Sequence, residues 1–328
     1  GGPRGPEAGG AGGGVPGGGL PGGGQGAAAG VLTPILLLGY TPTNCAEELL
    51  RYGLTQTVYD LESARAFSAA AQAAGRRLRI HVKADTGMSR LGWLCDEGHR
   101  TEAADAIAAV CALPGLEVEG IYTHFANADG DEAYTMGQFT RFLELLSELE
   151  GRGITFPIRH CAASAAVLKY PCTHLDMVRP GVALYGHYPD PSCEGLDGVG
   201  LRPVMALKTR VASVKAVPAG TPVSYGCTHV LERDAELAAL TVGYADGLPR
   251  LCSDQLEVLI RGQRAPIVGR VCMDMCMADA TGLGAAPGDE VELFGEHLPV
   301  EDAAALAGTI QYELLCAVSP RVPREYLN

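Results

Sequence analysis

The sequence is short of positive charge. It has 25 lysines and arginines against 38 aspartates and glutamates, which gives a formal net charge of −13 at pH 7. Nucleic acids and anionic membranes attract basic surfaces, so this balance excludes nonspecific binding to either of them. Long apolar runs are missing too. The chain has no stretch of the roughly 18 apolar residues that a membrane-spanning helix needs.

The 11 cysteines lack any regular spacing. Their number is odd, no CxxC motif occurs, and the closest pair is Cys272 and Cys276. A disulfide framework or a zinc site would need paired, regularly spaced cysteines. We therefore expect free thiols in a reducing cytosol, and hence a cytoplasmic protein without a metal.

Lysine is scarce as well. The chain has only Lys83, Lys169, Lys208 and Lys215, so none precedes position 83. Any chemistry that needs a lysine amine must use one of these positions.

The 328 residues, 47% of them hydrophobic, suit one barrel-sized domain and a smaller one. Residues 1–30 differ from the rest, since they hold 16 of the 44 glycines and few large apolar side chains. Such a segment buries too little surface to offset its backbone entropy, so we predict a disordered tail over residues 1–30. Its glycines do not form a phosphate loop, because the GxxxxGK[ST] motif is absent.

Residues 31–195 alternate between short apolar runs and segments of helical periodicity. Two helices are predicted, Leu61–Ala74 and Asp131–Glu150, each followed by a glycine. Repeated strand–helix units favour an α/β fold with a parallel, TIM-like (β/α) barrel that binds a cofactor. The predicted strands are Ile35–Leu38, Thr57–Tyr59, Leu78–Lys83, Val118–His124, Phe156–Cys161 and Leu175–Arg179. A closed barrel needs eight strands, so the barrel is predicted to be incomplete at its N-terminal side.

Residues 196–328 predict a β-rich C-terminal domain. Turn signals such as Pro218–Gly220 and Pro287–Asp289 separate its strands, and helical periodicity returns only at Glu301–Leu315. The predicted strands are Val204–Val217, Ala235–Gly243, Glu257–Arg261, Ala265–Asp274 and Glu290–Phe294. The boundary between the two domains is predicted within residues 189–203, which are rich in proline and glycine.

Candidate functional residues end the predicted barrel strands, where the active sites of such barrels lie. Lys83 ends one strand and Arg90 follows in the same loop, although a solvated surface pair is the alternative. His124 ends the next strand, and there a packed core histidine is the alternative.

Further candidates follow later in the chain. His160 lies in the predicted strand Phe156–Cys161, in a segment that leads to Ser164, which is either a helix N-cap or a phosphate ligand. Arg179 ends the last predicted strand, where an unpaired arginine would be costly. In the C-terminal domain Tyr244 lies between two glycines, which indicates an exposed phenol. The alternative is a plain turn capped by Asp246.

Together these segments resemble the fold-type III alanine racemases. Those are pyridoxal-phosphate enzymes with a TIM-like barrel and a β domain that work as head-to-tail dimers. The matching motifs, each weak alone, occur in one order along residues 34–328. They are Pro34–Pro42, Lys83–Gly92, Thr123–Ala126, Arg179–Gly181, Gly243–Gly247, Val271–Asp274 and Arg321–Arg324. The resemblance implies a homodimer with shared active sites that interconverts L- and D-alanine and supplies D-alanine for peptidoglycan.

The resemblance also implies roles for the candidate residues. Arg179 would face the pyridine nitrogen of pyridoxal 5'-phosphate and, because arginine keeps its proton, would leave that nitrogen unprotonated. His124 would bond Arg179 and orient the catalytic tyrosine, with His160 supporting the same network. Arg90 would contact the cofactor phenolate and the substrate carboxylate, positioned by a carbamate on Lys83.

Other groups would hold the cofactor phosphate and the substrate. The implied phosphate contacts are Ser164, Gly181, Val182 and Tyr312. The Met273 backbone would help to hold the substrate carboxylate. Ala163 is a departure, because the family usually has asparagine there, and one polar contact near the cofactor is lost.

Racemisation in this family uses one acid–base group on each face of the substrate. Tyr244, reaching in from the partner subunit, would act on the L-enantiomer. The second group is the lysine that also forms the aldimine with the cofactor. It lies in a Lys-Ala-Asn-Ala-Tyr-Gly-like motif that is absent from this sequence. We therefore expect the chain as given not to racemise alanine, since Lys83 should approach from the wrong position.

Two explanations for the missing motif stay open: a truncated or mis-framed coding sequence, and a non-catalytic descendant. Retention of His124, Arg179 and Tyr244 favours the first. The functional alternatives are a pyridoxal-phosphate-binding module without chemistry, a dimerising scaffold, and a serine racemase. Tyr312 is the aromatic residue of alanine-specific members, which favours alanine over serine.

Overall fold

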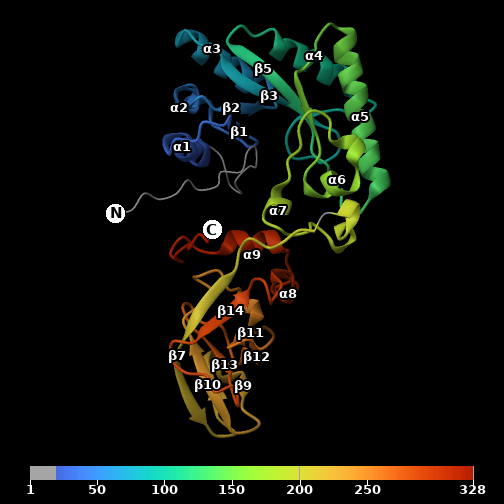
Figure 1. Cartoon of the computed structure of the whole chain (residues 1–328). Helices are drawn as coiled ribbons and strands as arrows, with labels where there is room; N and C mark the ends of the chain where they lie inside the picture. The colour runs from blue at the N-terminus through green and yellow to red at the C-terminus, as the bar shows by residue number, and fades with distance from the viewer. Residues whose placement is uncertain (1–19, 199, 328) are drawn as a thin grey trace. The chain divides into compact units, whose positions relative to one another are not determined.

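The chain forms two compact units, which divide between Leu201 and Arg202 (Figure 1). Figure 1 draws a computed structural model, which describes residues 20–198 and 200–327. The predicted boundary, between residues 195 and 196, lies close to this division. Each unit has its own hydrophobic core and is described by itself.

The first unit is built on a parallel sheet with the strand order β1-β2-β3-β5-β6, and β4 pairs with β3. All of these pairs run parallel. The strands are β1 (Leu36–Leu37), β2 (Thr55–Val58), β3 (Leu78–Asp85), β4 (Trp93–Leu94), β5 (Leu116–Tyr122) and β6 (Ile158–His160). This parallel half-barrel confirms the predicted α/β class with an incomplete TIM-like barrel.

Helices precede, connect and follow the strands of this sheet. They are α1 (Leu20–Ala28), α2 (Ala46–Tyr52), α3 (Leu61–Ala73), α4 (Arg100–Cys111), α5 (Glu132–Gly151), α6 (Ser164–Lys169) and α7 (Gly181–Leu184). Aspartate side chains cap two of them. Asp60 accepts a hydrogen bond from the Ser63 backbone at α3, and Asp131 accepts one from Tyr134 at α5. Such caps satisfy backbone N–H groups that a helix start leaves unpaired.

Strand β3 shows how the sheet separates its two faces. Its residues Leu78, Ile80, Val82 and Ala84 belong to the hydrophobic core. The residues between them are Arg79, His81, Lys83 and Asp85, and they share the opposite face because side chains alternate along a strand. One face of the sheet therefore packs into the hydrophobic core, and the other presents polar and charged side chains.

Two parts of the first unit differ from the prediction. The segment predicted to be disordered contains α1, while residues 1–19 lie outside the described part of the chain. Glycine serves packing here, since a Cβ at Gly23 would lie 2.7 Å from a methyl group of Leu37. The strand predicted at Leu175–Arg179 is reduced to one parallel bridge between Ala163 and Arg179.

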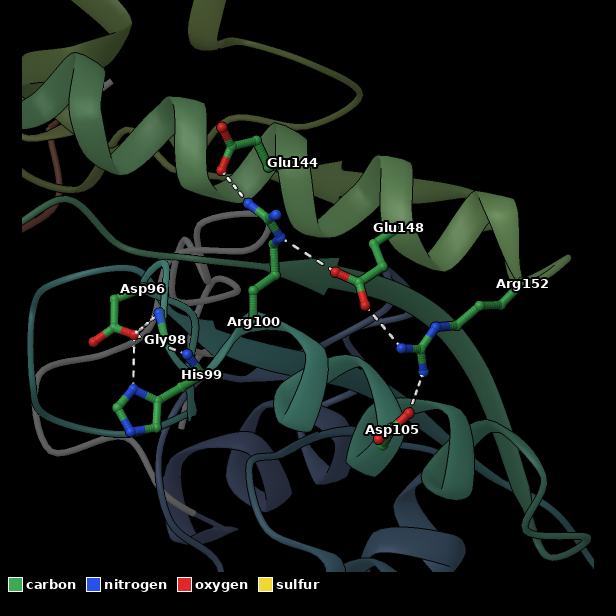
Figure 2. Close-up of polar contacts among 8 residues, drawn as sticks. All are labelled: Asp96, Gly98, His99, Arg100, Asp105, Glu144, Glu148 and Arg152. Carbon is green, nitrogen blue, oxygen red and sulfur yellow. Dashed lines mark hydrogen bonds and ion pairs between the residues drawn. The ribbon is translucent and has the colours of Figure 1, made fainter.

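A network of ion pairs joins α4 to α5 (Figure 2). Arg100 pairs with Glu144 and Glu148. Arg152 pairs with the other oxygen of Glu148 and with Asp105, at 2.8 and 2.5 Å. Glu148 thus bridges two arginines on the outer surface of the unit. At the start of α4, Asp96 accepts bonds from the backbone and ring of His99.

The second unit is built on an antiparallel sheet with the order β12-β11-β14-β7-β10-β13, beside a β8–β9 hairpin. Its elements are β7 (Leu207–Val217), β8 (Pro222–Val223), β9 (His229–Val230), β10 (Ala235–Leu240), β11 (Glu257–Ile260), β12 (Gln263–Pro266), β13 (Cys276–Asp279), β14 (Glu290–Phe294), α8 (Val300–Leu306) and α9 (Gln311–Ala317). The β-rich prediction is confirmed.

Two predicted elements of this unit are wrong in detail. The strand predicted at Ala265–Asp274 ends at Pro266, and the chain turns at Gly269, whose φ is +76°. Buried Val268 and Val271 produced the strand-like pattern from within a loop. The single helical segment predicted at Glu301–Leu315 is two helices, because Gly308 adopts a φ of +66° between them. Within the described residues, no helix is long and apolar enough to cross a membrane.

Replacing Glu148 with glutamine removes the charge that Arg100 and Arg152 share while it keeps the size of the side chain. We expect the free energy of unfolding to fall by at most about 1 kcal/mol, because solvent screens a partly exposed pair. The loss should shrink in about 1 M salt. Urea unfolding at low and high salt measures it, with Glu144→Gln, which affects only Arg100, as the smaller control. A loss that is unchanged in high salt would contradict this description.

Candidate active site

The predicted site residues of the first unit meet where its parallel strands end. Lys83 lies near the end of β3, His124 follows β5, His160 ends β6, and Arg179 is bridged to the chain just after β6. Adjacent parallel strands end at the same edge of a sheet, so residues distant in sequence become neighbours. Direct contacts connect three of these residues.

Arg179 is the centre of these contacts. Its side chain is buried and donates one hydrogen bond to His160 Nδ1 and another to His124 Nδ1, the latter at 3.0 Å. It also donates to the carbonyl oxygens of Thr123 and Cys161, at 2.9 and 3.0 Å. These acceptors are all neutral. Burial lowers the pKa of Arg179 to about 10, so the guanidinium still keeps its charge near neutral pH.

The positive charge of Arg179 acts on the histidines around it. Burial, and next the charge of Arg179, lower the pKa of His124 to about 3 and that of His81 to about 4. The pKa of His160 is lowered for the same reasons. All three imidazoles are therefore neutral at physiological pH, and each has one nitrogen that donates and one that accepts.

The ring of Tyr122 packs against His160, Arg179 and Lys83. Its ring stacks on His160 with centroids 4.6 Å apart, and the Arg179 guanidinium lies 5.1 Å from its centroid. Lys83 Nζ lies 5.2 Å from the same ring. The phenol bonds Thr57 at 3.0 Å. A cation over an aromatic face is stabilised by the ring's quadrupole, so Tyr122 helps to hold both cations in a buried place.

Lys83 is buried on the polar face of β3. Burial lowers its pKa to about 8, with Arg179 and Arg90 lowering it further and Asp85 opposing them. Part of the amine is therefore uncharged near neutral pH. Arg90 itself is exposed in the loop that follows.

Hydrogen bonds to the side chain of Asp85 and from helix α5 hold the loop that contains Arg90. Asp85 Oδ1 accepts hydrogen bonds from three consecutive backbone N–H groups, those of residues 87–89. From α5, Tyr134 donates to the Gly87 carbonyl at 2.6 Å and Arg141 donates to the Thr86 carbonyl at 2.9 Å. These contacts fix the backbone beside Arg90.

Gln138, on the same face of α5, joins this loop to the one after β5. It is fully buried and accepts a bond from the Ala126 backbone at 2.8 Å. Its amide nitrogen donates to the His124 carbonyl at 3.2 Å and to Thr86 Oγ1 at 3.4 Å. The loops that carry Arg90 and His124 are thus held by one helix.

The predicted phosphate contacts of this unit also come together. Ser164 is the first residue of α6, and Ala163 occupies the cap position, so Ser164 is not the N-cap. Its Oγ accepts a hydrogen bond from the Ala183 backbone at 3.3 Å, in α7, the helix that begins with Gly181 and Val182. A hydroxyl beside a glycine backbone can approach a phosphate closely.

The remaining predicted residues belong to the second unit. The backbone N–H groups of Tyr244 and Ala245 donate to the carbonyls of Cys272 and Met273, at 3.0 and 2.9 Å. Any Cβ at Gly243 would lie 2.3 Å from the Cys272 carbonyl oxygen, so only glycine permits this contact. Tyr244 and Met273 therefore lie in adjoining loops, and their side chains are 46% and 57% exposed.

Asp246 holds the Tyr244 loop. Its carboxylate accepts bonds from the Gly243 backbone at 2.9 Å and from Arg321 Nε at 2.7 Å. The Arg321 bond is the main reason that the pKa of Asp246 is lowered. The loop also packs on the end of α9, the helix of Tyr312, because a Cβ at Gly247 would lie 2.7 Å from the Ala317 carbonyl oxygen. The capped turn predicted as the alternative is thus present, and it presents an exposed phenol.

Three residues of the cluster were missed by sequence reasoning. His81 lies two residues before Lys83 on the same face of β3, and Tyr122 lies two residues before His124 within the strand predicted at Val118–His124, so strand alternation could have found both of them. Gln138 gave no such signal, because its burial depends on how α5 packs.

Acid should unfold the first unit because the neutral histidines take up protons only when it unfolds. The folded pKa values of His81 and His124 lie below the ordinary value, and that of His160 is lowered too. Stability is therefore fully present above about pH 6.5 and is lost as the pH falls toward the folded values. Three such groups give a slope of about 4 kcal/mol per pH unit between roughly pH 4 and 6. Urea unfolding followed by circular dichroism measures it.

The control for this titration is His99→Gln. His99 is exposed, and Asp96 raises its pKa rather than lowering it. The variant should keep the acid limb of the wild type. Stability that stays flat down to about pH 5 would contradict neutral, buried histidines.

Comparison with known proteins finds matches to both units of the chain. The family model of the alanine racemase N-terminal domain matches residues 23–189, and that of the C-terminal domain matches residues 204–326. The alanine racemase of Desulforamulus reducens is 49% identical over 303 residues, which are 92% of this chain and 80% of that protein. The alanine racemase of Desulfovibrio desulfuricans is 48% identical over 304 residues, with the same coverage of both chains.

Solved structures give the same answer. The alanine racemase of Clostridium difficile 630 matches with a TM-score of 0.86 and 37% identity, over 92% of this chain and 78% of that one. An alanine racemase from D-cycloserine-producing Streptomyces lavendulae matches with the same score and identity, over 93% and 80%. The chain therefore belongs to the alanine racemase family, a family of amino-acid racemases.

Proposed function

We propose that this chain binds pyridoxal 5'-phosphate and alanine at the ends of β3, β5 and β6, and supplies one side of the proton transfer that interconverts L- and D-alanine. The observation that carries the proposal is the bonding of buried Arg179 to His124 and His160. A buried arginine is usually balanced by a carboxylate, but among the residues that the structure describes Arg179 bonds only imidazoles and backbone carbonyls. The family, which depends on pyridoxal phosphate, supports this assignment.

The residues of the first unit fit the cofactor. When bound, pyridoxal phosphate draws electron density away from the substrate Cα, so that its proton becomes acidic. Arg179 would face the pyridine nitrogen. Because its pKa of about 10 keeps the guanidinium protonated, it would donate a hydrogen bond without giving up its proton. Ser164 Oγ and the backbone at Gly181 and Val182 would bind the phosphate.

Arg90 and Lys83 would bind the opposite end of the cofactor and the substrate carboxylate. The lowered pKa of Lys83 leaves part of its amine neutral, and a neutral amine can add CO₂ to form a carbamate with release of one proton. That anion would offset the nearby positive charges and orient Arg90.

Tyr244 would move the proton on one face of the substrate, with the Met273 backbone beside the substrate carboxylate. Two features support this role: the exposure of the phenol, and the rigid loop that Asp246 and Arg321 maintain. We propose that Tyr244 reaches the site of a partner subunit in a homodimer, which would also cover the exposed side chains around it. His124 Nε2–H would orient the phenol oxygen.

We propose that no lysine of this chain acts on the second face. Lys169 donates to the Asp129 carbonyl and to Ser192. Lys208 pairs with Glu290, and Lys215 is exposed on β7. Lys83 is inside the site but lies over the Tyr122 ring. We therefore propose that these 328 residues bind the cofactor without racemising alanine.

Alanine is the proposed substrate rather than serine, supported by the aromatic side chain of Tyr312. A cytoplasmic location and the supply of D-alanine for peptidoglycan belong to the same proposal and are supported by the family alone.

Turnover tests the missing second base. With saturating pyridoxal phosphate, the purified chain should produce no detectable D-alanine from L-alanine. Borohydride reduction followed by peptide mass mapping should find no cofactor on Lys83, because its amine is buried over Tyr122. Cofactor-dependent turnover, or a reduced cofactor on Lys83, would overturn this part of the proposal.

Replacing Arg179 with glutamine tests the cofactor site. The variant keeps a hydrogen-bond donor but loses the charge and the fork of the guanidinium, so the Kd of pyridoxal phosphate should rise at least about tenfold. Absorbance titration measures it. Arg264→Gln, which breaks the exposed pair with Glu257, is the matched control and should leave the Kd unchanged. Equal affinity of wild type and Arg179→Gln for pyridoxal phosphate would contradict the proposed function.

A further inference from the structure

His81 is a buried polar residue to which the proposed function gives no task. It lies on the polar face of β3, two residues before Lys83. Its Nδ1 is 2.9 Å from His160 Nε2, and the two rings are 5.1 Å apart. We propose that His81 is a positioning residue: by accepting a hydrogen bond from the Nε2–H of His160, it fixes the tautomer of that ring and thereby holds Arg179 in place.

The donor and acceptor roles in this chain follow from Arg179. A guanidinium has only donors, so His160 Nδ1 must accept from it. A neutral His160 then carries its proton on Nε2, the nitrogen that faces His81. His81 Nδ1 must accept a hydrogen bond from that N–H, which places the proton of the neutral His81 ring on its own Nε2. The arginine thus dictates one proton position on each of two successive rings.

The neighbouring strand β5 leaves room for the His81 ring. His81 pairs with Gly120 of β5, at a register shift that lies between Ile80 and His81. A Cβ at Gly120 would lie 2.6 Å from His81 Cε1 and 2.7 Å from its Nδ1. The absence of a side chain at Gly120 therefore lets the His81 ring lie flat over the neighbouring strand. On the other side, Tyr122 stacks against His160 at an interplanar angle of 9°.

The consequence of losing the acceptor follows from the same geometry. Without His81 Nδ1, the Nε2–H of His160 would be a buried donor without a partner, which is costly. The other tautomer of His160 would not restore the hydrogen bonds, because its Nδ1 proton would face the N–H of Arg179 and both donors would lack an acceptor. Either His160 turns or Arg179 moves, and in both cases the guanidinium loses a bond that holds it.

This inference concerns protons and contacts of the chain itself. Its consequence for the cofactor rests on the proposed function, since only there does the position of Arg179 matter to a bound ring. The two are tested by separate measurements.

Nuclear magnetic resonance of the protein with ¹⁵N-labelled histidine reports the tautomers directly. In wild type, His160 should show a protonated Nε2 and an unprotonated Nδ1 from about pH 8 down to about pH 5. His160→Asn identifies its signals among the eight histidines. A protonated Nδ1 on His160 would overturn the proposal.

A matched pair of variants then tests the positioning role. His81→Asn keeps an acceptor near the place of Nδ1, whereas His81→Leu has a similar size and no acceptor. The asparagine variant should keep the His160 tautomer and the slowly exchanging guanidinium protons of Arg179, and the leucine variant should lose both. Identical spectra in the leucine variant and wild type would overturn the proposal. If the leucine variant does not fold, loss of these signals in the folded asparagine variant would overturn it equally.

Pyridoxal phosphate is the second probe. Its Kd should rise about tenfold in His81→Leu and stay within about twofold of wild type in His81→Asn. If wild type binds no pyridoxal phosphate, the proposed function fails, but the tautomer result still decides the role of His81. If wild type binds and both variants bind equally well, His81 does not position Arg179 for the cofactor.

Discussion

A buried positive charge held by neutral acceptors is the constraint from which the chemistry of the first unit follows. Arg179 has lost its water and, in the described part of the chain, donates its hydrogen bonds to imidazoles and backbone carbonyls. An uncompensated buried charge would be strongly unfavourable, and these several acceptors make it tolerable. Burial, and next this charge, keep the neighbouring histidines neutral; burial is also the main reason that the pKa of Lys83 is lowered, and the charge of Arg179 adds to it. Because Arg179 stays protonated and the histidine nitrogens that face it carry no proton, it acts as a fixed hydrogen-bond donor.

The two faces of the parallel sheet make this arrangement possible. On β3, apolar side chains anchor one face to the helices, while His81 and Lys83 project from the other. Helix α5 then fixes the loops beyond the strands through Tyr134, Gln138 and Arg141. The site therefore needs both the alternation of the strands and the packing of a distant helix.

Much of this could be predicted from the sequence, and the failures have physical reasons. Lys83, His124 and His160 were found because each ends a run with clear strand alternation. Helix α1 was missed because its glycine content indicates disorder, whereas its glycines let it pack against Leu37. The strand predicted at Leu175–Arg179 forms only a bridge. His81 and Gln138 were missed because their importance lies in hydrogen bonds to residues far away in the sequence. The roles of Tyr244, Met273 and Tyr312 stay predictions that rest on the family.

Neutron diffraction from crystals grown near neutral pH tests the central claim most directly, because it locates the protons around Arg179. The account predicts a fully protonated guanidinium, with single protons on the Nε2 atoms of His81, His124 and His160 and none on their Nδ1 atoms. A proton on Nδ1 of His124 or His160, or a second proton on either ring, would show that Arg179 does not organise the site.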